Sequence, residues 1–172
     1  MTDFGHTIIG PDGSVLGAGD KVPCELAMQR ASNESRRVYE AWHKLRMNGN
    51  LPGLTDWENA KAVPDLQHSV LVTEILAEPH DYRYLKLGSR AIEVRGYDPT
   101  GKTVRDCYEG DALVFVLDNY DQAIAYPYGI VDFSIEVVRD HDFIELETLL
   151  LPLADDGSTP SHVLVYGHFL LR

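Results

Sequence analysis

Basic residues, cysteines and long apolar runs are all scarce in this chain, and each scarcity excludes a class of protein. Lys and Arg number 15 against 27 Asp and Glu over 172 residues, so the formal net charge is −12. A field of that sign repels nucleic-acid phosphates and anionic lipid headgroups. The two cysteines, Cys24 and Cys107, are too few for a disulfide scaffold. We therefore expect no nucleic-acid partner and no disulfide-rich fold.

Targeting and membrane signals are missing as well. The segment MTDFGHTIIG at the N-terminus lacks the basic start and the apolar run of a signal peptide. No stretch approaches the ~18 uninterrupted apolar residues of a membrane span. We expect a cytoplasmic protein with no membrane partner, and its length predicts one domain of ordinary size.

The sequence also lacks the spacings that build metal sites and common catalytic sites. The seven histidines are scattered, and neither Cys-x-x-Cys nor His-Glu-x-x-His occurs. No glycine-rich phosphate loop leads into a helix, and there is no Gly-x-Ser-x-Gly elbow. The sequence therefore predicts no metal site and no enzyme of a familiar class.

Residues 1–31 are rich in glycine and proline and are predicted to be an N-terminal extension. The apolar runs of HTIIGPDGSVLG flank Pro11-Asp12-Gly13, which is typical of a β-hairpin. An isolated hairpin is marginally stable in water, so this one either docks on the domain or is mobile. The domain itself is predicted to span residues 32–172.

A helical pattern begins after Ser32. Val38, Trp42 and Leu45 recur at helical spacing and form one apolar stripe. Either Ser32 or Asn33 can accept a free N–H of the first turn. We assign the stripe as a candidate surface for a partner protein or a second copy of the chain, with packing against the domain core as the alternative.

The rest of the chain alternates between strands and helices. Strands are predicted at 68–77 and 82–88, a short helix at 89–95 and a longer helix at 109–125. Three further strands are predicted in GIVDFSIEVVR, FIELETLLLPL and HVLVYGHFLLR. Two blocks of hairpin-linked strands with helices between them predict an α+β fold with an antiparallel sheet.

Several of these segments resemble the family of small stand-alone bacterial PAS proteins. The resembling pieces are SRRVYEAWHKLR, LVTEIL, YRYLKLGSRAIEVRGYDPTGKTVRD and ELETLLLPLADDG, and they cover about residues 33–172. The resemblance implies a five-stranded antiparallel sheet with helices over one face, plus an N-terminal helix. It also implies a pocket between sheet and helices for a small ligand or cofactor, and signal transduction through protein–protein interaction.

The residues disfavour two cofactors that PAS proteins bind. Haem-binding relatives carry an axial His on the longer helix, and the matching segment YEGDALVFVLDNYDQAIAY has none. Light-sensing relatives carry Cys in a G-R-N-C-R-F-L-Q run that binds flavin, and GKTVRDCYEG does not match it. The cofactor therefore stays unassigned.

Candidate pocket residues follow from the predicted faces of the longer helix and the last strands. They are Phe115, Asn119, Tyr126, Phe133, Thr148 and His168. Asn119 and Thr148 are the most informative of them, because a buried polar group needs a partner. Ordinary core packing is the alternative for all six.

The function expected from these features is that of a non-enzymatic sensory or regulatory module. It binds a small molecule, a partner protein or both, and it signals in trans because no output domain fits within 172 residues. Two alternatives remain. One is a small ligand-processing enzyme in which Glu145 and His168 form the candidate pair, although Glu145 and Glu147 are expected together on an exposed strand face. The other is a structural adaptor with a filled core.

Overall fold

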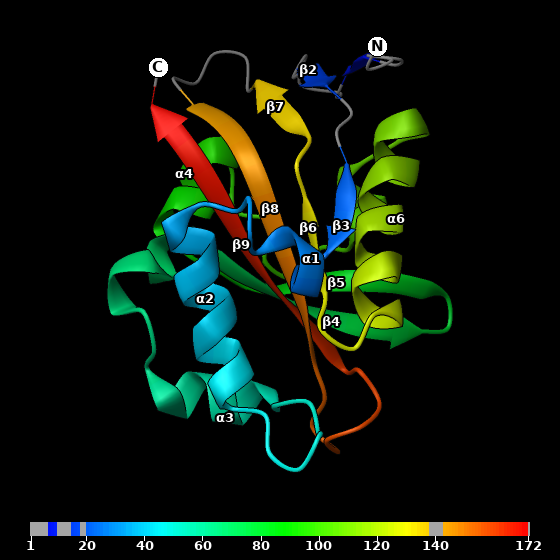
Figure 1. The fold of residues 1–172 in the computed structure, drawn as a ribbon. Coiled ribbons are helices and arrows are strands. Elements are labelled where there is room, and N and C mark those ends of the chain that lie inside the picture. The colour runs from blue at the N-terminus through cyan, green and yellow to red at the C-terminus, as the bar shows by residue number, and fades with distance from the viewer. Residues whose placement is uncertain (1–6, 10–14, 18–19, 138–142, 172) are drawn as a thin grey trace.

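An antiparallel β-sheet runs through the centre of the protein (Figure 1). The computed structural model describes residues 7–9, 15–17, 20–137 and 143–171. In this part of the chain the sheet holds nine strands in the order β1-β2-β7-β8-β9-β4-β5, while β6 pairs with β8 and with β3. The strands are β1 (Thr7–Ile9), β2 (Val15–Gly17), β3 (Lys21–Pro23), β4 (Val70–Ala77), β5 (His80–Leu87), β6 (Ile130–Asp132), β7 (Ile135–Val137), β8 (Phe143–Leu153) and β9 (His162–Leu171).

Helices cover both faces of this sheet. In chain order they are α1 (Cys24–Ala27), α2 (Asn33–Lys44), α3 (Leu54–Ala60), the 3-10 helix η1 (Pro64–Ser69), α4 (Ser89–Arg95), α5 (Val104–Cys107) and α6 (Gly110–Ala125). Residues of α1, α2 and α3 pack in one hydrophobic cluster, and residues of α4, α5 and α6 pack in another. The predicted α+β class with an antiparallel sheet is confirmed.

The two clusters are separated because side chains alternate along the central strands. On β8, Leu149 and Leu151 belong to the cluster beneath α2, whereas Leu150 belongs to the cluster beneath α6. Both faces of β8 are therefore buried, which explains why its sequence is a continuous apolar run in this region.

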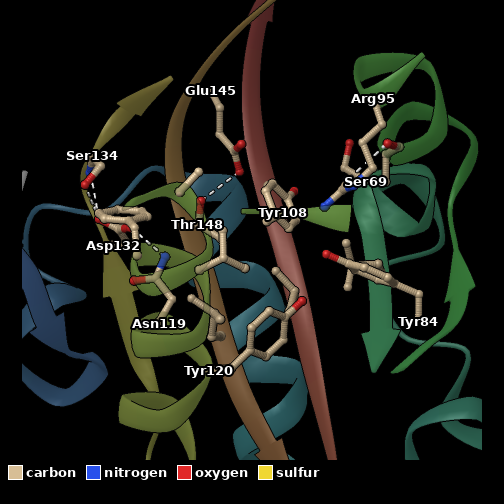
Figure 2. Close-up of a pocket in the computed structure, with 18 of the residues that line it drawn as sticks. Ser69, Tyr84, Arg95, Tyr108, Asn119, Tyr120, Asp132, Ser134, Glu145 and Thr148 are labelled. Atoms are coloured by element: carbon tan, nitrogen blue, oxygen red, sulfur yellow. Dashed lines mark hydrogen bonds between the residues drawn. The ribbon is translucent and has the colours of Figure 1, made fainter. Parts of the chain in front are cut away.

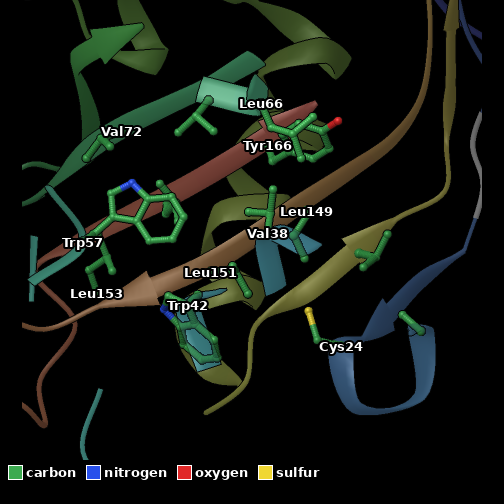
Figure 3. Close-up of a cluster of buried hydrophobic side chains, with 14 residues drawn as sticks. Cys24, Val38, Trp42, Trp57, Leu66, Val72, Leu149, Leu151, Leu153 and Tyr166 are labelled. Carbon is green, nitrogen blue, oxygen red and sulfur yellow. The ribbon is translucent and has the colours of Figure 1, made fainter. Parts of the chain in front are cut away.

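The stripe on α2 is core and is not available as a partner surface. Val38 and Trp42 are fully buried, and Leu45 packs against the same cluster (Figure 3). The Trp42 indole Nε1–H donates to the carbonyl oxygen of Pro152 at 3.0 Å. The amphipathic pattern was interpreted correctly as a helix, and the alternative of core packing is the one that the structure shows.

The N-terminus of α2 is held by a buried carboxylate. Ser32 is the cap, and its Oγ accepts from the backbone N–H of Ser35 at 3.1 Å. Glu147 of β8 accepts from Ser32 N at 2.9 Å and from Ser35 Oγ at 2.7 Å. Only 9% of Glu147 is exposed. This side chain therefore links β8 to the helix on one face of the sheet.

The N-terminal segment belongs to the sheet. β1 pairs with β2 in the register Thr7↔Gly17, as the predicted hairpin requires, and its turn lies outside the described residues. β2 continues the sheet beside β7, and β3 does the same beside β6. Cys24 and Ala27 are fully buried in the core, so the segment from Lys21 onward is an integral part of the domain.

The predicted strand GIVDFSIEVVR is divided into β6 and β7. Asp132 causes the interruption, because its Oδ1 accepts from Ser134 N at 2.9 Å and from Ser134 Oγ at 2.6 Å. An aspartate that hydrogen-bonds the backbone two residues ahead forms a local turn in place of the strand ladder. Residues 140–142, between the predicted strands GIVDFSIEVVR and FIELETLLLPL, lie outside the described residues.

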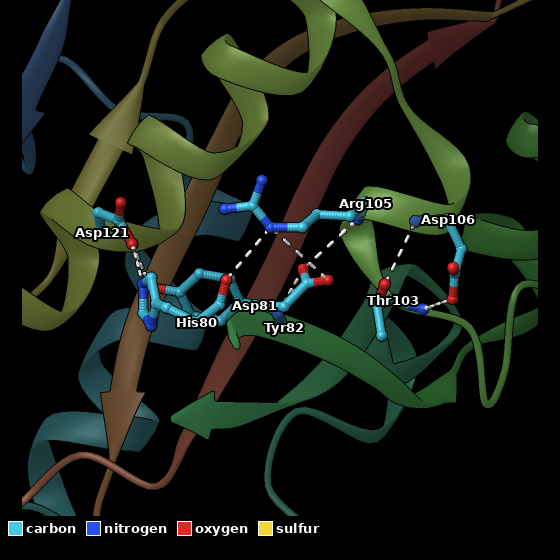
Figure 4. A network of polar contacts seen from close by, with 7 residues as sticks. All are labelled: His80, Asp81, Tyr82, Thr103, Arg105, Asp106 and Asp121. Atoms are coloured by element: carbon cyan, nitrogen blue, oxygen red, sulfur yellow. Dashed lines mark hydrogen bonds and ion pairs between the residues drawn. The ribbon is translucent and has the colours of Figure 1, made fainter. Parts of the chain in front are cut away.

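A polar network fastens the β4–β5 hairpin to the helices that follow it (Figure 4). The Tyr82 hydroxyl donates to Asp121 of α6 at 2.6 Å, and His80 Nε2 lies 2.8 Å from the same oxygen. Arg105 of α5 lies 4.0 Å from buried Asp81 and donates to the His80 carbonyl at 3.2 Å. These contacts fix α5 and α6 relative to the sheet.

Candidate functional site

A cavity of about 110 Å³ lies between the sheet and the helices α4 and α6 (Figure 2). Its walls come from the strands β4, β5, β6, β8 and β9 and from the helices and loops beside them. Polar groups supply about half of its lining residues: Ser69, Tyr84, Arg95, Tyr108, Asn119, Tyr120, Asp132, Ser134, Glu145 and Thr148. The apolar lining residues are Leu71, Ala91, Ala112, Phe115, Val116, Leu150, Val165, Gly167 and Phe169.

One end of the cavity carries an amide and a buried carboxylate. Asn119 Nδ2 donates to Asp132 Oδ2 at 2.8 Å, and Ser134 fills the other oxygen of Asp132. Asn119 is 7% exposed and Asp132 is 2% exposed. The second polar atom of the amide, Asn119 Oδ1, is buried and has no hydrogen-bond partner among the described residues. A buried acceptor without a donor is costly, so this atom is an unsatisfied point in the packing beside the cavity.

The other end carries a guanidinium group. Figure 2 shows Arg95, Ser69 and Tyr84 on one side of the pocket and Asn119, Asp132 and Ser134 on the other. Arg95 is half-buried in the last turn of α4 and donates to the Ala91 carbonyl at 3.1 Å. Its guanidinium carbon lies 5.6 Å from the centre of the Tyr84 ring. The cavity therefore has a cationic end.

Arg95 keeps its charge in this setting. Burial alone would lower the pKa of Arg95, but the electrostatic influence of the neighbouring tyrosines and of Glu145 outweighs burial, and the pKa is raised. Burial raises the pKa of Tyr84 and of Tyr120 above their ordinary value of 10.0. Both phenols are therefore neutral near pH 7 and act as hydrogen-bonding groups.

A β-bulge on β8 separates two glutamates that the sequence predicted on one face. The register shifts between Glu145 and Glu147. Glu145 accordingly lines the cavity, where its Oε1 accepts from the Thr148 hydroxyl at 2.7 Å, while Glu147 faces α2. The expectation of a shared exposed face was wrong, because an extra residue in one strand reverses the alternation beyond it.

Three of the six predicted pocket residues line the cavity. Phe115 and Asn119 reach it from α6, and Thr148 reaches it from β8. Phe115 also lies beneath Lys21, whose ammonium nitrogen is 4.4 Å from the centre of the ring. The helical spacing of α6 and the alternation of β8 were sufficient to place these three.

The other three predicted pocket residues lie elsewhere. Tyr126 follows the end of α6 and is 43% exposed. Phe133 comes directly after Asp132, so it turns to the opposite face and packs against the core beneath α2, where Arg30 lies 3.9 Å from its ring centre. His168 lies between Gly167 and Phe169, which both face the cavity, and therefore points away from it.

Gly167 makes room for the aromatic wall of the cavity. A Cβ at this position would lie 2.6 Å from the Phe169 ring. Glycine thus permits Phe169 to fold against its own strand beside Glu145. The sequence analysis did not identify Phe169 as a lining residue.

The most important residue that sequence reasoning missed is Arg95. It was treated as the end of a short helix before Gly96, and the φ of 76° at Gly96 does end that helix. The available signal was a basic residue at the end of a predicted helix, in a chain whose net charge is −12. Asp132 was missed for a different reason: the apolar face of its strand, with Phe133, was predicted to line the pocket.

Among the residues that the structure describes, the candidate metal-ligating and catalytic side chains do not come together. Among the residues described, no group of three or more His, Cys, Asp and Glu is placed to hold a metal ion, and both cysteines are free. No histidine lines the cavity, and His168 is paired across the strands with Glu147, on the face away from Glu145. The predicted Glu145–His168 pair is therefore not formed.

Comparison with known proteins gives no relative to set beside this geometry. No protein-family model, no curated protein and no solved structure matches the chain. No helix in the described part of the chain combines the length and the apolar character needed to cross a bilayer. The proposed function therefore depends on the geometry of the cavity.

Proposed function

We propose that this protein is a non-enzymatic sensory or regulatory module of the PAS type. It binds a small molecule in the cavity beside α6 and passes the signal to a partner protein. The antiparallel strands β5, β4, β9, β8 and β6, with three helices between β5 and β6, support this proposal, because the resemblance implies an antiparallel sheet of five strands with helices over one face. The additional strands β1, β2, β3 and β7 extend that arrangement at one edge.

The observation that carries the proposal is the cavity between the sheet and the helices α4 and α6, which has polar groups at both ends. Asn119 and Asp132 form a hydrogen-bonded pair at one end, and Arg95 lies at the other. A filled-core adaptor has no need of a cavity lined by a guanidinium group and two carboxylates, because burying charged groups is costly. The cavity also combines apolar walls with convergent polar groups, as ligand sites do.

A route for the signal exists in β8. Glu145 and Thr148 of this strand line the cavity, while Glu147 holds the start of α2 on the opposite face. When a ligand binds one placement of the β8 strand more tightly than another, it increases the population of the placement that it prefers. The helix α2 and the surface around it then report occupancy of the cavity to the partner.

A cavity-filling variant tests this function directly. Ala112 of α6 lines the cavity, and Ala112→Leu is expected to occupy part of its volume. Ala125→Leu makes the same change at an exposed position of the same helix and serves as the control. The assay is a thermal-shift screen with small amines, carboxylic acids, alcohols and aromatic compounds, repeated by NMR on the full chain.

We expect some compounds to stabilise the wild type and Ala125→Leu but not Ala112→Leu. Each variant is first shown by circular dichroism to unfold cooperatively. The proposal is overturned if no compound class binds, or if compounds that bind the wild type bind Ala112→Leu equally well. Native mass spectrometry of the purified protein adds a second test, because a retained ligand appears there as extra mass.

A further inference from the structure

We infer that the cavity binds a small methylated ammonium ion, with the buried carboxylate of Asp132 as its counter-ion. The carboxylates and aromatic rings of the lining attract a cation, and the hydrogen bonds already made within the lining favour a cation without N–H donors. This inference rests on the proposed function, because it names the class of ligand for the same cavity.

Asp132 is a buried carboxylate that has hydrogen-bond donors but no counter-ion. Only 2% of it is exposed, and it accepts from Asn119 Nδ2 and from the N–H and hydroxyl groups of Ser134, which are all neutral. In the described part of the chain, no Lys, Arg or His forms an ion pair with it. A buried charge without a counter-charge is costly, so a cation in the cavity would stabilise this carboxylate.

The basic residues around the cavity already have carboxylates near them. Lys21 lies opposite Asp132 in the pairing of β3 with β6, but its ammonium group ion-pairs with Asp118. Arg95, at the other end, lies in the field of Glu145, which lines the same cavity. The lining as a whole carries two carboxylates and one guanidinium group, and a ligand with a single positive charge balances it.

The floor of the cavity places Asp132 opposite an aromatic wall. Asp132, Thr148 and Gly167 are paired in one row across β6, β8 and β9. Because neighbouring strands lie ~4.8 Å apart, Asp132 and Gly167 are roughly 10 Å apart along this row. The Phe169 ring folds over Gly167, where a Cβ would lie 2.6 Å from it. An ammonium group above Thr148 therefore has the carboxylate on one side and a ring on the other.

Aromatic side chains supply the second attraction. Five of them line the cavity: Tyr84, Tyr108, Phe115, Tyr120 and Phe169. The face of an aromatic ring attracts cations, and two of these rings already do so within the protein. The Lys21 nitrogen lies 4.4 Å from the centre of the Phe115 ring. The Arg95 guanidinium carbon lies 5.6 Å from the centre of the Tyr84 ring. This attraction requires no hydrogen bond, so it suits an ammonium ion whose hydrogens are replaced by methyl groups.

Hydrogen bonds within the lining favour a methylated over a primary ammonium ion. Asp132 accepts through both oxygens, and Glu145 accepts from the Thr148 hydroxyl at 2.7 Å. A primary ammonium brings three N–H donors, each of which needs an acceptor once it leaves water. A quaternary ammonium has none, while its charge acts on the carboxylates through space.

The volume limits the size of the ligand. A cavity of ~150 Å³ binds benzene, and the volume here is about 110 Å³. The buried part of the ligand is therefore a small head group such as trimethylammonium.

Matched compounds test the inference on the wild-type chain. Choline and 3,3-dimethylbutan-1-ol share one shape and differ in charge, because a carbon atom replaces the nitrogen in the alcohol. Ethanolamine keeps the charge and lacks the methyl groups. We would titrate the full chain by NMR with each compound at constant ionic strength. We expect choline to bind at least about tenfold more tightly than either analogue.

Two variants assign the groups that recognise the cation. Asp132→Asn is expected to weaken the binding of choline at least about tenfold and to leave that of the alcohol nearly unchanged. Asp81→Asn is the matched control, since Asp81 is also buried and accepts from a neighbouring N–H but lies outside the cavity lining. Phe169→Leu keeps an apolar wall without the ring, so it should weaken choline more than the alcohol. Phe133→Leu, on the opposite face of the sheet, is its control.

The outcomes separate this inference from the proposed function. If other compounds bind and Ala112→Leu blocks them, but choline binds no more tightly than the alcohol or no more tightly than ethanolamine, the ammonium inference fails and the binding function stands. The inference also fails if Asp132→Asn and Asp81→Asn weaken choline equally, because the charge then acts from outside the cavity. If nothing binds the wild type in either experiment, both fail. The wild-type preferences and Phe169→Leu decide the question even if Asp132→Asn does not fold.

Discussion

Replacing Glu147 with glutamine removes the charge that holds the start of α2 while keeping the shape of the side chain. In the wild type both carboxylate oxygens accept from Ser32 N, at 2.9 and 3.0 Å, and Oε2 also accepts from the hydroxyls of Ser32 and Ser35. A glutamine amide offers one acceptor and presents an NH₂ group to these donors. We therefore expect α2 to be attached less firmly to β8.

The size of the effect follows from the number and kind of bonds lost. Hydrogen bonds to a charged group contribute about 1.5–3 kcal/mol and neutral ones about 0.5–1.5 kcal/mol. A negative charge at a helix N-terminus adds about 0.3–1 kcal/mol. We expect Glu147→Gln to lower the free energy of unfolding by about 2–3 kcal/mol, which is a fall in Tm of roughly 5–10 °C for a chain of this size.

Urea and thermal unfolding at pH 7, followed by circular dichroism, measure this loss. Glu40→Gln is the control, because Glu40 is exposed on the same helix and the change in net charge is identical. The reasoning is refuted if the two variants differ by less than about 0.5 kcal/mol, the usual range for surface substitutions.

Three further predictions concern stability. Trp42→Ala should lower the free energy of unfolding by about 3–5 kcal/mol in urea titrations. If Trp42 belonged to a partner surface, the same substitution would change association alone. A hydrogen bond from Arg37 lowers the pKa of Asp65 below 3.8 in the folded state, so this ion pair contributes to the free energy of unfolding above pH 3.8. The contribution is lost as the pH falls through the folded pKa, and the loss measured by acid titration should be smaller in high salt, because salt screens the pair. Burial and the bond to Asp121 raise the pKa of Tyr82 above 10.0, so stability should fall as the pH rises beyond 10.0, with phenolate absorbance appearing only on unfolding.

Local patterns predicted most of the elements and their order. The helix 89–95 coincides with α4, and the helix 109–125 lies within one residue of α6, because each has a clear apolar period and a glycine or proline near its end. Residue type alone left Ser32 and Asn33 as the two cap candidates, and the structure shows Ser32 as the cap. Where the apolar periodicity is strong and a capping residue, glycine or proline marks the end of the helix, the sequence is sufficient to predict the helix and its bounds.

The pocket was harder to predict because it depends on which face of each strand turns inward. The bulge beside Glu145 reverses the faces of β8, and the turn made by Asp132 ends β6 early, so residues chosen by simple alternation fall on the wrong side. The place of Arg95 in the cavity lining depends on how α4 packs on the sheet, and no residue near Arg95 in the sequence shows that α4 faces a cavity.

The short strands β2 and β3 have a protective role in the assembly of the sheet. They occupy the hydrogen-bonding groups along one side of β7 and β6, which would otherwise be an open edge. An open edge is a template onto which another chain can add a strand. A shortened protein that begins at Ser32 should therefore self-associate through this edge, so the solubility of the domain would depend on a few residues that precede its first long helix.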